Sequence, residues 1–332
     1  MAVTIEDIKK LRNLTGAGLS DCKKALIEAE NDLDKAVELI RKRGQAIAAK
    51  REDRDAAQGV ALAKTVGEFA AIVALKCETD FVAANEKFVN LTTMILNAAV
   101  DARCKSLDEV NNLVVDGKTI AEHITALSGI TGEKMELGAY ECLEAPFTVI
   151  YNHFNKKLAT IVAFNKAEVD ADVAKGVAMQ AASMNPKAAT REQIDPKIVD
   201  EELRIAVDKT KAELVQKAVD AALKKAGFNP YYCATEEHQD EAVRKGYMTE
   251  AQVAEARELM AKTAEAKAAS LPDQMIQNIA QGRLAKFFQE NVLMEQNYEA
   301  AEGEKITVAE FLARSDKELK AVALKRVNLN VD

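Results

Sequence analysis

The chain has 332 residues, of which 48% are hydrophobic and 30% are charged, with 53 acidic against 45 basic side chains. This length and apolar content are enough for a buried core divided over two or three compact units. The acidic excess disfavours a protein that neutralises nucleic-acid phosphates, and no stretch approaches the roughly 20 apolar residues that span a bilayer. The N-terminus has no basic segment followed by an apolar one, so we expect no signal peptide and a cytoplasmic protein.

The cysteines and histidines form no recognisable chemical site. The five cysteines are odd in number and widely spread: Cys22, Cys77, Cys104, Cys142 and Cys233. No pair has the Cys-x-x-Cys spacing, so we expect reduced, mostly half-buried thiols and no metal. The histidines His123, His153 and His238 are equally scattered, and no G-x-x-x-x-G-K-[ST] loop is present. We therefore predict no catalytic residues, no cofactor and no direct nucleotide binding, with a helical enzyme as an open alternative.

Residues 1–55 predict a module of three helices followed by a linker. Apolar residues recur at helical spacing over 5–14, 22–30 and 33 to about 44, and the glycines of Thr15-Gly16-Ala17-Gly18 separate the first two helices. The segment 41–55 carries many charges of both signs, which favours a solvated linker or a helix extension. Such a small module is suited to recognition through a surface loop.

A hairpin and a corner follow the module. Residues 60–64 and 69–76 predict two strands, because the run 69–75 is apolar and too short for a helix. Thr79 and Asp80 can accept hydrogen bonds from the free amides of a first turn, so we expect a helix from there to about residue 100.

Phe81 lies in the first turn of this expected helix, where a ring can face inward or outward. Phe81, Phe88 and Ile95 fall on one helical stripe. This periodicity favours a ring packed in the core over a ring displayed for a partner. The segment 107–127 then predicts further helical pieces, with a turn at Asp116-Gly117 and an end at Ser128-Gly129.

The second half of the chain repeats the order of a hairpin and a helix. Strands are expected at 147–151 and 158–164 and a helix at 172–184, which suggests an internal duplication of the architecture. Charged helical patterns at 198–226 and 249–269, with coiled-coil-like spacing, predict an antiparallel arm that mediates contacts or acts as a brace. A helix at 276–287, a capping box at Thr307-x-x-Glu310 and a strand at 321–329 complete the pattern.

The predicted fold class is α+β. It combines the three-helix module, a two-part core of β-hairpins or small antiparallel sheets packed with helices, and an inserted antiparallel helical coiled-coil arm. The expected domains are 1–55 for the module and linker, 56–138 for the first half of the core, 139–197 with 271–332 for the second half, and 198–270 for the arm.

Two segments closely resemble the signatures of the elongation factor Ts family. The first covers residues 11–26, Leu-Arg-Asn-Leu-Thr-Gly-Ala-Gly-Leu-Ser-Asp-Cys-Lys-Lys-Ala-Leu, and the second covers residues 77–82, Cys-Glu-Thr-Asp-Phe-Val. The resemblance continues through Tyr151-x-His153 and Gly282-Arg283 to the C-terminal strand. It implies a module similar to ubiquitin-associated domains and a core of two α+β halves. The chain departs from the family pattern at Ala74 and Lys76, where Glu and Asn are usual, and in its longer arm.

The resemblance also implies a function: guanine-nucleotide exchange on elongation factor Tu, the GTPase that delivers aminoacyl-tRNA. The family's intruding pair corresponds to Asp80 and Phe81, flanked by Thr79 and Val82. Phe81 would insert near the Mg²⁺ and phosphate region of the GTPase, so that GDP leaves and GTP can reload.

Three further partner contacts carry over from the family. They are Arg12, Leu19 and His153. Leu19 stands at a position where the family has a methionine type of residue. His153 lies in the second hairpin, and the turn after it is one residue longer than in the family. The residues alone leave an alternative open, a helical protein-binding or dimerisation module without exchange activity. A homodimer is compatible with either interpretation.

Overall fold

The computed structural model describes residues 3–301 and 303–330. The chain divides into two compact units, unit 1 with Met1–Thr190 and Val292–Asp332 and unit 2 with Arg191–Asn291. Throughout the described ranges, every helix is too short or too polar to cross a membrane.

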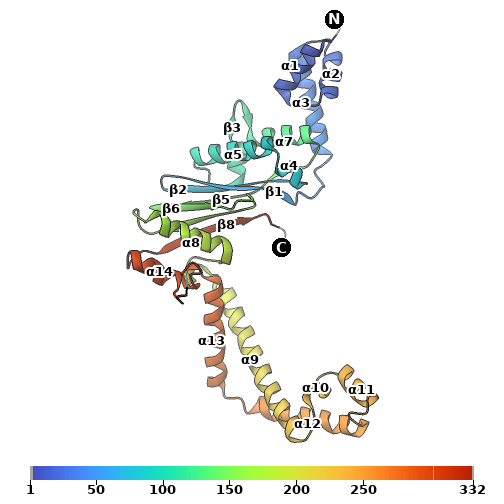
Figure 1. Ribbon diagram of the computed structural model, residues 1–332, viewed down its shortest axis with the longest axis vertical. Coiled ribbons are helices and arrows are strands. Elements are labelled where there is room, and N and C mark those ends of the chain that lie inside the picture. Colours follow the sequence, from blue (N-terminus) through green and yellow to red (C-terminus); the bar gives the residue numbers. More distant parts are fainter. Residues whose placement is uncertain (1–2, 302, 331–332) are drawn as a thin grey trace. The chain divides into compact units, whose positions relative to one another are not determined.

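Unit 1 combines helices with small antiparallel sheets, which confirms the α+β class (Figure 1). Its helices are α1 Ile5–Thr15, α2 Leu19–Glu28, α3 Leu33–Ala49, α4 Asp80–Ala83, α5 Glu86–Asp101, α6 Leu107–Asn112, α7 Ile120–Thr131, α8 Ala171–Met184 and α14 Val308–Ser315, with a 3₁₀ turn at Leu293–Glu295. Its strands are β1 Gln58–Val66, β2 Phe69–Cys77, β3 Val114–Val115, β4 Lys118–Thr119, β5 Met135–Glu144, β6 Phe147–Asn152, β7 Leu158–Phe164 and β8 Ala321–Asn328.

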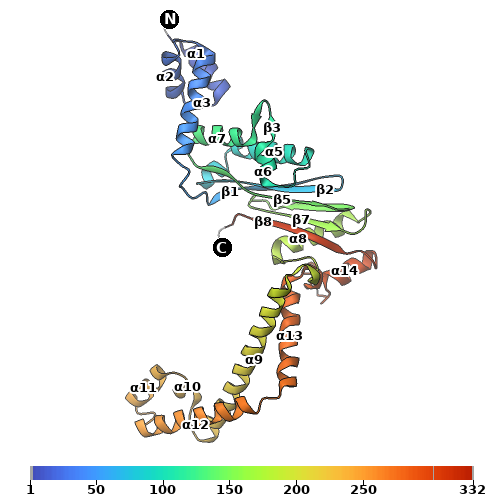
Figure 2. The ribbon, with the colours of Figure 1, turned by 180° about the vertical axis from the view of Figure 1, so that it is seen from behind.

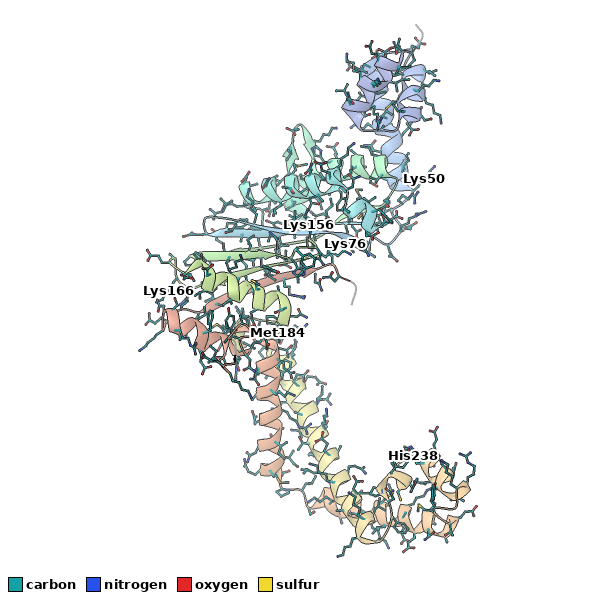
Figure 3. All side chains as sticks on the ribbon, viewed as in Figure 1. Lys50, Lys76, Lys156, Lys166, Met184 and His238 are labelled. Atoms are coloured by element: carbon teal, nitrogen blue, oxygen red, sulfur yellow. The ribbon has the colours of Figure 1, made fainter. Side chains whose placement is uncertain are left out.

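The first three helices share a small apolar core. Its fully buried side chains are Leu11, Cys22, Ala25, Leu26 and Ala36. The first helix ends where the sequence predicts, because Gly16 takes a left-handed backbone conformation with φ 71°. The third helix continues to Ala49, beside the Lys50 labelled in Figure 3, so much of the charged segment is a helix extension.

Two three-stranded antiparallel sheets, in the orders β1-β2-β5 and β6-β7-β8, pack between two helical layers. Helices α5 and α7 cover the first sheet and α8 covers the second (Figures 1 and 2). Alternate residues of β2 therefore face different layers: Val73 and Leu75 contact the helices, whereas Ile72 and Ala74 lie between the sheets. Because both faces of β2 are buried, its sequence is an uninterrupted apolar run from Phe69 to Leu75.

The two sheets are also joined at the free edge of β1. The side chain of Asn152 donates from Nδ2 to the carbonyl of Ala63 at 2.9 Å, and its Oδ1 accepts from the N–H of Ala63 at 2.7 Å. The N–H of Ala61 donates to the carbonyl of Lys156 at 2.7 Å. These bonds pair backbone groups that an edge strand leaves unpaired, and they fix the β6–β7 loop against the first sheet.

The structure of the core differs from the predictions in three places. Strand β5 was not predicted, because residues 135–144 include a glycine and show no regular alternation. Helix α7 does not end at Ser128-Gly129 but continues to Thr131, and Gly132 takes the left-handed cap with φ 74°. The helix expected to run without a break to residue 100 is divided into α4 and α5, because Asn85 has an extended backbone and its side chain caps α5.

Unit 2 consists of helices only within its described residues. After a 3₁₀ turn at Arg191–Gln193 these are α9 Pro196–Lys225, α10 Pro230–Cys233, α11 Glu236–Arg244, α12 Glu250–Ala269 and α13 Asp273–Asn291. The long α9 packs against both α12 and α13 (Figure 1). Residues 271–291, expected in the core, therefore belong to this helical unit, because α13 packs along α9.

The layer between the sheets gives a test of the fold. Ile72 is fully buried there among alanines, so Ile72→Ala should leave a cavity and lower the free energy of unfolding of unit 1 by about 2–5 kcal/mol. Val66→Ala is the control in the same hairpin, since Val66 is about half exposed, and it should cost less than about 1 kcal/mol. Urea titration of both variants measures the difference. Equal losses would contradict the two-sheet packing.

Candidate functional site

The corner after β2 is held by a carboxylate from another segment. Glu133, in the connection from α7 to β5, accepts a hydrogen bond from the Thr79 hydroxyl at 2.6 Å and one from the Thr79 N–H at 3.1 Å. The same hydroxyl oxygen accepts from the N–H of Val82 at 3.3 Å and so caps α4. Thr79 therefore fixes the point where the strand ends and the helix begins.

Glu78 fastens the same corner on its other side. Its carboxylate accepts from the N–H of Lys134 at 2.7 Å and from the Arg54 guanidinium at 2.9 Å, with Arg51 at 3.9 Å. The Lys134 N–H, and after it Arg54 and Arg51, lower the pKa of Glu78 below its usual value. The segment that follows α3 is thus tied to the corner.

Cys77 lies beneath the corner as a structural thiol. Burial, with a smaller effect from the negative charge of Glu133, raises the pKa of Cys77 to about 12. The thiol therefore stays protonated at neutral pH and donates to the Thr79 carbonyl at 3.2 Å. Four of the five cysteines are buried and only Cys142 is half-buried, so the thiols are less accessible than expected. Among the described residues, no three His, Cys, Asp or Glu side chains gather as a metal site.

Phe81 points to solvent, with 84% of its surface exposed. The prediction from helical periodicity, a ring in the core, is wrong. The stripe that included Phe81 assumed one continuous helix, but the break at Asn85 changes the phase, so that Phe88 is buried while Phe81 is not. Asp80 is exposed beside it, and Val82 and Ala83 turn toward the core.

The N-terminal module displays a second group of side chains. Arg12 is exposed near the end of α1, and Leu19, half exposed, begins α2 on the other side of the glycine loop. Leu14 lies between them in the sequence and is also largely exposed, although the sequence analysis did not single it out. Three exposed side chains therefore flank the loop at residues 15–18.

A third group lies in the β6–β7 loop. His153 is half-buried, and its Nδ1 lies 2.9 Å from the Tyr151 hydroxyl. The next residue, Phe154, is 87% exposed, and its ring centroid is 4.5 Å from that of His153. Phe154 was not predicted as a site residue, although an aromatic residue in a polar turn can mark such a position in the sequence. Beside this loop is a hollow of about 400 Å³, lined in part by Met179 and Tyr298.

The seven predicted residues thus fall into three groups in unit 1. Thr79, Asp80, Phe81 and Val82 form the corner. Arg12 and Leu19 flank the glycine loop, and His153 is the one predicted residue in the β6–β7 loop. Glu133, which holds the corner, was not predicted, because nothing in its local sequence marks a contact 54 residues away. Aromatic residues are enriched at protein–protein interfaces, so an exposed ring on a hydrogen-bonded support is compatible with a protein that binds other proteins.

Comparison with known proteins gives the family. The model of the family described as Elongation factor TS matches residues 78–330. Proteins named elongation factor Ts from Bacteroides thetaiotaomicron, Porphyromonas gingivalis and Azobacteroides pseudotrichonymphae are 53%, 42% and 39% identical to the chain, and each comparison covers both proteins in full. The chain belongs to the elongation factor Ts family, whose members are elongation factors of protein biosynthesis.

The pKa of Glu78 gives a test of the corner. Because its folded-state pKa lies below the ordinary 4.5, the carboxylate stabilises the fold above the unfolded-state pKa, and this stabilisation is lost as the pH falls through the folded-state pKa. We expect Glu78→Gln to lower the free energy of unfolding at pH 7, and the difference from the unaltered chain to shrink below about pH 4. Urea titrations across pH measure it. Glu68→Gln, at the exposed turn of the same hairpin, is the control, and an equal pH-dependent loss there would contradict the assignment.

Proposed function

We propose that the chain is a guanine-nucleotide exchange factor for elongation factor Tu. It binds the GDP form and the nucleotide-free form of this GTPase, promotes the release of GDP and so allows GTP to reload during translation elongation in the cytoplasm. Membership of the elongation factor Ts family supports the partner, and the exposure of Phe81 on a fixed corner is the observation that carries the mechanism.

The exchange follows from linked binding equilibria. An exchange protein that binds the empty GTPase more tightly than the GDP form must weaken GDP binding by the same ratio, because coupling between two ligands is reciprocal. Faster release by about four decades requires a barrier lower by about 5.5 kcal/mol. Burial of one Phe side chain contributes only about 1.5–3 kcal/mol. Phe81 therefore needs further contacts to account for exchange.

The three groups of side chains divide this work. Phe81, with Asp80 beside it, inserts near the region of the GTPase that holds Mg²⁺ and phosphate. Arg12 and Leu19 at the glycine loop, and His153 in the β6–β7 loop, supply binding energy elsewhere on the same partner. The factor itself needs no cofactor, metal or nucleic acid for this action.

Two finer features of the architecture belong to the same proposal. The first three helices act as a recognition module similar to ubiquitin-associated domains, and α9 with α12 forms a coiled-coil arm. The first interpretation derives from the family resemblance and the second from the helical periodicity of the sequence, and both are compatible with the helical packing described above. A homodimer remains compatible with the exposed surfaces, and light scattering at several concentrations tests it.

The first functional prediction concerns Phe81→Ala. Because the ring is 84% exposed, its removal should change the free energy of unfolding by less than about 0.5 kcal/mol. Loss of the insertion should slow the release of fluorescent GDP from elongation factor Tu by about 10- to 150-fold, the kinetic equivalent of burying one Phe. Stopped-flow fluorescence with purified proteins measures the rate.

Val114→Ala is the matched control, because Val114 is another exposed apolar residue and lies on β3, outside the three groups. It should leave the release rate unchanged. Binding of the unaltered chain to the GTPase without any release of GDP would overturn the exchange proposal in favour of a plain binding module.

The second functional prediction separates binding from insertion. Arg12→Ala should raise the concentration of factor needed for half-maximal release while the release rate at saturation stays close to that of the unaltered chain, since Arg12 adds binding energy away from the nucleotide. Loss of one hydrogen bond to a charged group corresponds to about 1.5–3 kcal/mol, or roughly 10- to 150-fold in that concentration. A fall in the saturating rate alone would contradict the division of roles.

A further inference from the structure

Helices α3 and α7 cross at a pair of glycines, Gly44 and Gly129. A Cβ atom on Gly129 would lie 2.3 Å from the Cα of Gly44 and 2.8 Å from its carbonyl carbon and oxygen. No side chain fits at such a distance from backbone, so α3 reaches α7 only because residue 129 is glycine. Glycine is less favourable than alanine inside a helix, which makes its use in both helices notable at this crossing.

The contact is not symmetrical. A Cβ atom on Gly44 would lie 3.6 Å from the Cα of Gly129, which is an ordinary van der Waals distance. Alanine is therefore tolerated at position 44 but not at position 129. Gly44→Ala and Gly129→Ala each add one methyl group to the same crossing, but only Gly129→Ala is expected to disturb it. Gly44→Ala is therefore the matched control.

Part of the space beside this contact is open. A cavity of about 200 Å³ lies beside the crossing, and its lining includes Leu14 of α1, Ile47 of α3, Ile130 of α7 and the glycine loop. Ile47 and Ile130 are each more than one third exposed. Because little apolar surface is sealed around it, the glycine crossing carries much of the precision with which the N-terminal module is placed.

The last turn of α7 connects this crossing with the Phe81 corner. Ile130 approaches the glycine loop, since a Cβ atom on Gly16 would lie 3.5 Å from its Cδ1. The Ser128 hydroxyl donates to the carbonyl of Glu133 at 2.6 Å, and the Glu133 carboxylate holds Thr79. One short segment, residues 128–133, therefore contacts the module on one side and fixes the corner on the other.

We propose that Gly129 is a positioning residue, which sets the spacing between the glycine loop of the N-terminal module and the Phe81 corner. The functional part of this inference rests on the proposed function, in which both groups contact one GTPase. Two linked contacts bind more tightly than either alone only if the geometry lets both engage at once. Displacement of the module by a bulkier residue 129 should then weaken binding without removing any contacting side chain.

The spacing is measured first without a partner. Spin labels on Lys24→Cys in α2 and Asn90→Cys in α5, both at exposed positions and in a Cys142→Ser background, report the distance from module to core by pulsed dipolar spectroscopy. We expect Gly129→Ala to shift or broaden the distance distribution, and Gly44→Ala and Gly282→Ala to leave it unchanged, because Gly282 in α13 has open space around it. An unchanged distribution in Gly129→Ala would overturn the inference.

The release of fluorescent GDP from elongation factor Tu then tests the consequence. Gly129→Ala should raise the half-saturating concentration at least about tenfold, with the saturating rate within about twofold of the unaltered chain, and both other glycine variants should behave as the unaltered chain does. Circular dichroism confirms that each variant is folded. A changed spacing with an unchanged half-saturating concentration would overturn the functional part. If the unaltered chain releases no GDP, the proposed function fails, while the distance measurement still decides whether Gly129 places the module.

Discussion

The carboxylate of Glu133 determines how the chain leaves β2. With both its hydroxyl and its N–H bonded to this carboxylate, Thr79 is held as the N-cap of α4, and Phe81 two residues later is directed into solvent. Display of the ring forgoes about 1.5–3 kcal/mol of burial. Two hydrogen bonds to a charged acceptor contribute a comparable free energy, about 1.5–3 kcal/mol each before solvent screening. The anchor is therefore strong enough to keep an aromatic side chain exposed.

Patterns of local origin were predictable from the sequence. Both hairpins, the capping box at Thr307 and the helices of the first module follow from apolar periodicity and turn residues, and the structure has them near the expected positions. Phe81 shows where periodicity fails. Its stripe is valid only while the helix continues, and one capping residue, Asn85, restarts the helix in another phase. The family resemblance, which does not depend on that phase, implies a displayed Phe81, and the ring is exposed.

Features that depend on distant contacts could not be found in the same way. Glu133 and Asn152 are ordinary polar residues in their local sequence, and each acquires its role from a segment more than 50 residues away. In the sequence, Gly129 is typical of a helix end. It nevertheless lies inside α7, where the close approach of the α3 backbone leaves room only for glycine. Likewise, the pairing of α13 with α9, rather than any change in composition, sets the limit of the helical unit.

Rigid support and exposure are complementary in an exchange factor. A displayed ring on a mobile loop would have to be ordered on binding, at a cost of about 0.5–1.5 kcal/mol for each immobilised side chain, and this cost would reduce the small free energy that one ring provides. At the corner, that ordering is completed during folding by Thr79, Glu78 and their partners. The same reasoning applies to the spacing between the contact groups, since free energy used to bring the module into place is not available to displace a nucleotide. A close crossing of two glycines that places the module is therefore as consistent with nucleotide exchange as the exposed Phe81 ring is.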